Sequence, residues 1–132
     1  MIIGTFELGH EYVTLEAQKK ETGGAFKCCH ADHMRPRIKV GLDYERFDKV
    51  IGCLIHESLE FALSRLQARF SPSLELAADH SSYLFSFGHV TLSEASFMVA
   101  EYVTTVMPYL REAWEKREEP EEQPGGNYNN HS

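Results

Sequence analysis

A histidine and two glutamates stand close together in the apolar stretch LIHESLEFAL, residues 54–63. If this stretch is helical, His56 and Glu60 lie on one face, a turn apart. Zinc binds imidazole nitrogen and carboxylate oxygen at about 2.0–2.2 Å, so these two residues could supply half of a tetrahedral site. Glu57 lies about 100° round the helix. In the H-E-x-x-H pattern that residue is the general base for a metal-bound water, and the same role is predicted here.

The apolar flanks of this stretch predict that the helix is mostly buried here. A buried histidine and buried carboxylates need partners, and a cation is the simplest common partner. Glu60 replaces the second histidine of H-E-x-x-H, which adds negative charge and makes the metal a weaker Lewis acid. The alternative interpretation is an ordinary helix with three polar residues on its solvated side.

A zinc site needs a third protein ligand, and the candidates lie downstream. We rank His80 first, because Asp79 beside it could fix its tautomer. His89 ranks second. Glu94 has another explanation as half of a helix cap, and Glu101 lies in mid-helix, where it could face solvent.

The stretch KCCHADH forms a second cluster of metal-binding residue types, Cys28, Cys29, His30 and His33. Structural zinc sites usually space their cysteines as C-x₂₋₄-C. Adjacent cysteines in a strand point to opposite sides, so we expect one thiol to pack inward and the histidines to lie in a loop. These histidines could still approach the helical site.

Composition limits the classes of function. The chain has 132 residues, enough for one domain with a modest core, and a net charge of −7. That charge argues against nucleic acid and anionic membranes as partners. There is no apolar run of about 20 residues, and because the first residues have no basic leader, we do not expect them to act as a signal peptide. Three cysteines do not form a disulfide framework, so a cytoplasmic protein is expected.

Hydrophobic patterning predicts strands first and then two long helices. The predicted strands cover residues 2–8, 11–17, 25–29, 35–42 and, less regularly, 83–87. The first helix is expected from residue 44 to about 70, capped by Asp43. Its apolar stripe would comprise Ile51, Ile55, Leu59, Ala62 and Leu66.

The second helix is expected over residues 91–114, with a Thr91–Glu94 capping box. Pro108 should kink or locally break it. The residues expected on its buried face are Leu92, Ala95, Val99, Tyr102, Val106 and Leu110.

Residues 35–115 also carry a family resemblance. The motif His56-Glu57-x-x-Glu60, the following Asp79-His80 and the ending MPYLREAW resemble small, largely uncharacterised proteins of bacteriophages and prophages. Such proteins look like minimal zincins, in which strands precede the ligand-bearing helix. The resemblance implies His56 and Glu60 as zinc ligands and Glu57 as base. It also implies host-cell cytoplasm as the location if the protein is phage-encoded.

We therefore expect a single α+β domain, residues 1–116, with a small antiparallel sheet packed on two long helices. Residues 117–132 are charged and then rich in Pro, Gly and Asn, which predicts a disordered tail. Two functions fit. The first is a zinc-dependent hydrolase acting on a peptide or protein. The second is a non-catalytic phage accessory or host-interaction protein.

Overall fold

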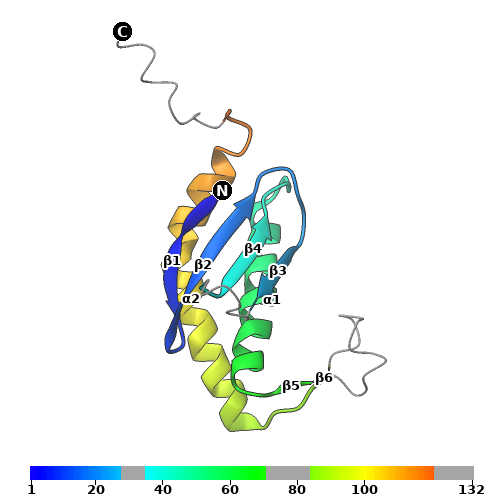
Figure 1. Cartoon of the computed structure of the whole chain (residues 1–132). Helices are drawn as coiled ribbons and strands as arrows, with labels where there is room; N and C mark the ends of the chain where they lie inside the picture. Colours follow the sequence, from blue (N-terminus) through cyan, green and yellow to red (C-terminus); the bar gives the residue numbers. More distant parts are fainter. Residues whose placement is uncertain (28–34, 71–83, 121–132) are drawn as a thin grey trace.

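The computed structural model describes residues 1–27, 35–70 and 84–120. It shows one four-stranded sheet and two long helices, which confirms the α+β class (Figure 1). The cysteine–histidine cluster of residues 28–34, Asp79 and His80, and the tail from residue 121 lie outside the described residues. Predictions about these segments stay predictions.

The sheet is formed by β1 (Ile2–Leu8), β2 (Glu11–Gln18), β3 (Gly24–Lys27) and β4 (Arg37–Gly41), in the order β1-β2-β4-β3. The strands match the sequence prediction within a few residues. Gly9, at φ 67°, makes the tight turn between β1 and β2, where its lack of a side chain permits the left-handed backbone.

The sheet is mixed, whereas a wholly antiparallel sheet was expected from the sequence. β1 pairs antiparallel with β2, and β3 antiparallel with β4, but β2 and β4 are parallel. The reason is the apolar character of β4, whose Ile38 and Val40 are fully buried. Such a strand takes a central position, and the shorter, more exposed β3 is left at the edge.

Helix α1 spans Phe47–Arg65, a shorter range than predicted. Its N-cap is Arg46, with no side-chain cap, so the predicted Asp43 cap is wrong. The predicted apolar stripe is also displaced, because Ile55 is 41% exposed. The residues that α1 buries are Val50, Leu54, Glu57, Ser58, Phe61, Ala62 and Leu63.

After α1, β5 (Arg69–Phe70) pairs antiparallel with β6 (Leu84–Phe85). Helix α2 then spans His89–Glu115 and runs unbroken through Pro108. It starts two residues before the predicted capping box, with Gly88 as N-cap and no side-chain cap, so that prediction is wrong. Its buried face is close to the predicted one, although Leu92 is exposed and Val103 is buried.

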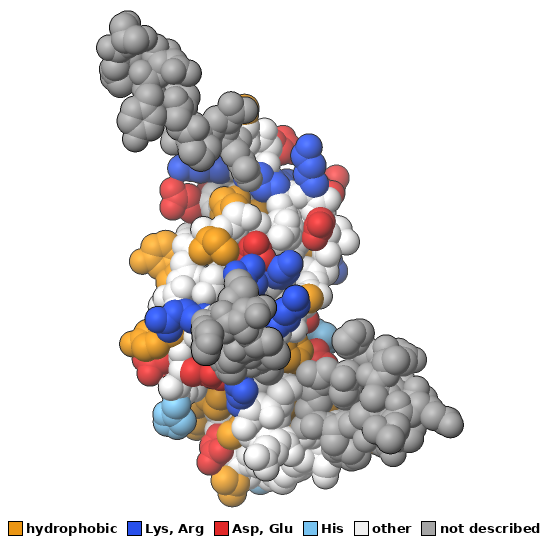
Figure 2. All heavy atoms as spheres, in the orientation of Figure 1, with side chains coloured by type: hydrophobic (Ala, Val, Ile, Leu, Met, Phe, Trp, Pro, Cys, Tyr) orange, Lys and Arg blue, Asp and Glu red, His pale blue; other side chains and the backbone are white. Residues whose placement is uncertain are grey.

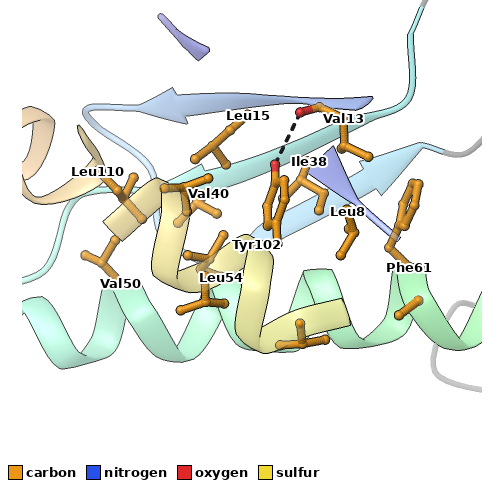
Figure 3. Close-up of a cluster of buried hydrophobic side chains, with 14 of the residues drawn as sticks. Leu8, Val13, Leu15, Ile38, Val40, Val50, Leu54, Phe61, Tyr102 and Leu110 are labelled. Carbon is orange, nitrogen blue, oxygen red and sulfur yellow. Dashed lines mark hydrogen bonds between the residues drawn. The ribbon is translucent and has the colours of Figure 1, made fainter. Parts of the chain in front are cut away.

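The core lies between one face of the sheet and the two helices. α1 packs on β3 and β4, whereas α2 packs on β1 and on α1. Tyr102 is fully buried at the centre of this layer, and its hydroxyl is 3.5 Å from the carbonyl oxygen of Val13 (Figure 3). Burial raises the pKa of the Tyr102 phenol, because the ionised form would lose its hydration.

Within the described residues, no helix combines the length and the hydrophobicity that crossing a bilayer requires. Helix α2 ends at Glu115, and Pro120 is the last described residue.

Candidate metal centre

Three side chains in the middle of α1 converge on one small volume. One donor atom from each of His56, Glu57 and Glu60 can be chosen so that all three lie within 4.8 Å of one another. Helical geometry explains the convergence, because Glu60 lies about 40° from His56 and about 60° from Glu57 around the axis. This cluster could bind a metal ion.

The three residues differ in exposure, which corrects the prediction that all are buried. The side chain of His56 is 73% exposed, whereas that of Glu57 is 7% exposed. Glu60 is half-buried. Glu57 therefore lies on the buried side of α1 and His56 on its exposed side. The cluster is open to solvent on the side of His56.

Glu57 is buried beside strand β3 because Gly24 leaves room for it. A Cβ atom at Gly24 would lie 2.8 Å from Cγ of Glu57 and 2.7 Å from the carbonyl oxygen of Lys39. Both distances are shorter than ordinary van der Waals contact. A glycine at this position of β3 therefore lets the Glu57 side chain approach the strand closely.

The buried carboxylate of Glu57 contacts the imidazole of His56. Oε2 of Glu57 lies 3.0 Å from Nδ1 of His56, a hydrogen-bonding distance. When Nδ1 carries a proton, it donates to the carboxylate and offsets part of the cost of burying it. A metal ion would take over that role by displacing the proton, so metal and proton compete here.

The donor set fits a divalent metal with nitrogen and oxygen preference. Ligands of a tetrahedral zinc ion, bound at about 2.0–2.2 Å, lie roughly 3.4 Å apart. Donors that already lie within 4.8 Å need only small side-chain rotations to reach that spacing. One neutral imidazole and two carboxylates would balance the charge of the ion, and zinc accepts both donor types.

Glu57 was predicted to be a general base and not a ligand, but its carboxylate lies as close to the predicted ligands as a third ligand would. Its carboxylate contacts His56 directly and belongs to the same group of donors as Glu60. The geometry therefore allows Glu57 to act as a third ligand. The signal that sequence reasoning missed is Gly24, in the stretch TGGAF, which makes this packing possible.

His89 is not part of the cluster. It is the first residue of α2, and α2 runs antiparallel to α1, with Trp114 beside Phe47 and Met98 lining a cavity with Leu66. A rise of about 1.5 Å per residue then places His89 roughly 28 Å from His56 along the helix axes. His80 lies outside the described residues and stays a predicted ligand.

Other candidate residues also lie elsewhere. Glu94 lines a cavity of about 710 Å³ with Leu8, Leu66 and Met98, near the ends of the helices. Glu101 is exposed on α2. Among the described residues, these two carboxylates do not join the group formed on α1.

Comparisons of the chain with protein-family models, with curated proteins and with solved structures found no match. The resemblance to phage-encoded, zincin-like proteins therefore stays a prediction from the sequence.

Proposed function

We propose that this protein binds one zinc ion through His56, Glu57 and Glu60. The observation that carries the proposal is the convergence of their three donor atoms within 4.8 Å. A buried carboxylate adds support, because Glu57 is held in place by α1 and by its close packing against Gly24. Ligands that are fixed before the metal arrives lose little conformational freedom on binding.

Three protein ligands leave at least one position of the ion for water or another ligand. The exposed side of His56 would make this position accessible from solvent. A zinc ion with this geometry can polarise a bound water, which is the chemistry of zinc hydrolases. Two carboxylates in the ligand set would make that water less acidic than a site with two histidines does.

Calorimetric titration of the metal-free chain with zinc tests the binding proposal. We expect one zinc per chain, with the affinity reduced by about tenfold or more in His56→Ala and in Glu60→Ala. His10→Ala is the matched control, because His10 is an exposed histidine in the β1–β2 turn, away from the cluster. Unchanged zinc affinity in both cluster variants would refute the proposal.

The second candidate function is hydrolysis of a peptide or amide bond at this zinc ion. The observation that favours it is the 73% exposure of His56, which leaves the cluster accessible to water and substrate. In this mechanism the ion would be held by His56 and Glu60 without Glu57, and Glu57 would accept a proton from the attacking water. The contact between Glu57 and His56 favours the alternative, a non-catalytic accessory or host-interaction protein in which the metal is structural.

The variant Glu57→Gln separates these roles. As a ligand, Glu57 contributes to affinity, so the variant binds zinc more weakly. As a base, it contributes to turnover, so the variant keeps zinc but no longer cleaves a casein substrate. No cleavage of casein or of fluorogenic peptides by the zinc-loaded wild-type protein would remove the hydrolase proposal and leave the binding proposal intact.

A further inference from the structure

The face of the sheet that points away from the helices carries a group of basic residues. We call Lys27, Arg35, Arg37 and Lys39 the basic face. Strand register places Lys27 opposite Arg37, and residues opposite each other share a face. Lys39 lies two residues from Arg37 on β4, and the guanidinium of Arg35 lies 5.9 Å from the ring centre of Tyr12.

Figure 2 is in the orientation of Figure 1 and shows Lys and Arg side chains grouped near the centre of the view, over the strands. Lys27 and Arg35 are exposed, and the side chains of Arg37 and Lys39 are 29% and 43% exposed. These positive charges are therefore accessible to a partner, in a chain whose net charge is −7.

The carboxylates that the structure describes on this face do not balance the basic residues. Glu16, on β2, has one oxygen, Oε2, that lies 3.7 Å from both Arg37 and Lys39. This atom is buried and has no hydrogen-bond partner. Glu7 on β1 lies opposite Tyr12 on β2 and is the second carboxylate that the register places on this face. Among the described residues of this face, two carboxylates thus face four cations.

The pairing of Lys27 with Arg37 is unfavourable for the fold itself. Like charges directly opposite each other on neighbouring strands destabilise a sheet. An anionic partner would relieve this repulsion and would also supply the hydrogen-bond acceptors that these side chains lack among themselves. The charge distribution therefore points to an anionic partner.

An acidic polypeptide fits the basic face better than a nucleic acid does. Arg37 and Lys39 are about 6.6 Å apart along β4, the spacing of alternate side chains in an extended peptide. Nucleic-acid platforms use several aromatic side chains, whereas Tyr12 is the one exposed aromatic residue of the described strands on this face. The overall negative charge repels a long polyanion, while a short acidic segment senses mainly charges within a Debye length, about 8 Å.

We propose that the basic face binds an extended acidic segment of a partner protein, with its carboxylates on Arg37 and Lys39. This interaction is independent of the proposed zinc site, which lies on α1 on the other side of the sheet. A chelator in the assay therefore keeps the two proposals apart.

Fluorescence anisotropy with a labelled peptide of alternating glutamate and threonine tests this proposal, using the full chain in EDTA. We expect binding at about 50 mM salt that weakens about tenfold at 300 mM. The double variant Arg37→Gln/Lys39→Gln should bind about tenfold more weakly. The matched control, Lys20→Gln/Lys49→Gln, removes the same charge from exposed positions elsewhere and should keep the wild-type affinity.

A variant that binds the peptide more tightly gives the clearest test, because misfolding would not increase the affinity. Glu16→Gln removes the carboxylate that competes for Arg37 and Lys39, so the peptide should bind about threefold more tightly or better. Unchanged or weaker binding by Glu16→Gln overturns the proposal, as does an equal loss in the control. Tighter binding of a labelled oligothymidylate than of the peptide would overturn the assignment to an acidic polypeptide.

Discussion

Replacing Gly24 by alanine would place a methyl group between β3 and the metal centre. The new Cβ would lie 2.8 Å from Cγ of Glu57 and 2.7 Å from the carbonyl oxygen of Lys39. Optimal van der Waals separation between carbon atoms begins at about 3.5 Å, so Cγ of Glu57 and the new Cβ must move apart by roughly 0.7 Å. We expect this overpacking to lower the free energy of unfolding by about 1–3 kcal/mol.

The same displacement moves Glu57 away from His56 and Glu60. If Glu57 is a zinc ligand, the affinity for zinc should fall by about 10–100-fold, the usual effect of disturbing the surroundings of a ligand. Urea denaturation in EDTA measures the cost to the fold, and calorimetric titration with zinc measures the cost to the site.

Gly52→Ala is the matched control for this experiment. Gly52 lies on α1 one turn before His56, and a Cβ there meets nothing within 4 Å. The substitution should raise the free energy of unfolding by about 0.5–1 kcal/mol, because alanine favours helix, and leave zinc affinity unchanged. A Gly24→Ala protein that is destabilised but binds zinc like the wild type would refute the role of Glu57 as a ligand.

Three further predictions follow from the described residues. Phe61→Ala should lower the free energy of unfolding in urea by about 3–5 kcal/mol, because Phe61 is fully buried; a loss below about 1 kcal/mol would contradict its place in the core. Because the raised pKa of Tyr102 means that only the unfolded chain releases this proton just above pH 10, wild-type stability should fall with pH there. In Tyr102→Phe, the free energy of unfolding measured in urea should fall less steeply with pH. Identical pH slopes in the two proteins would contradict this prediction. His89→Ala should bind zinc with wild-type affinity by calorimetry, and a loss as large as that of His56→Ala would show that His89 reaches the ion.

The first two strands were predictable because each has a local signature, whereas β5 falls in the range expected to be helical. Hydrophobic patterning predicted strands over residues 2–8 and 11–17, and the structure has β1 at Ile2–Leu8 and β2 at Glu11–Gln18. The parallel pairing of β2 with β4 was not predictable in this way. It depends on which strand takes the centre of the sheet, a competition between segments far apart in the sequence.

The buried face of α1 was misassigned because polar residues interrupt it. Ser58 is fully buried, and its hydroxyl donates to the carbonyl oxygen of Leu54 at 2.7 Å, so the helix backbone satisfies it. Glu57 is buried beside it. The predicted buried face, which was based on aliphatic residues alone, therefore included Ile51 and Ile55. Ile51 is half-buried and Ile55 is exposed.

Within the candidate site, helical spacing was enough to bring His56 and Glu60 together. The position of Glu57 depended on a tertiary contact, the close approach of β3 at Gly24, which the sequence of α1 does not contain. The predicted ligand His89 failed to join the cluster because the antiparallel packing of α2 carries its first residue to the far end of α1.

Anomalous diffraction at the zinc absorption edge, from crystals grown with zinc, tests the proposed metal centre most directly. We predict one anomalous peak on α1, at about 2.0–2.2 Å from a nitrogen of His56 and from carboxylate oxygens of Glu57 and Glu60. A zinc ion held only by other residues, or no peak beside these three side chains, would contradict the proposal.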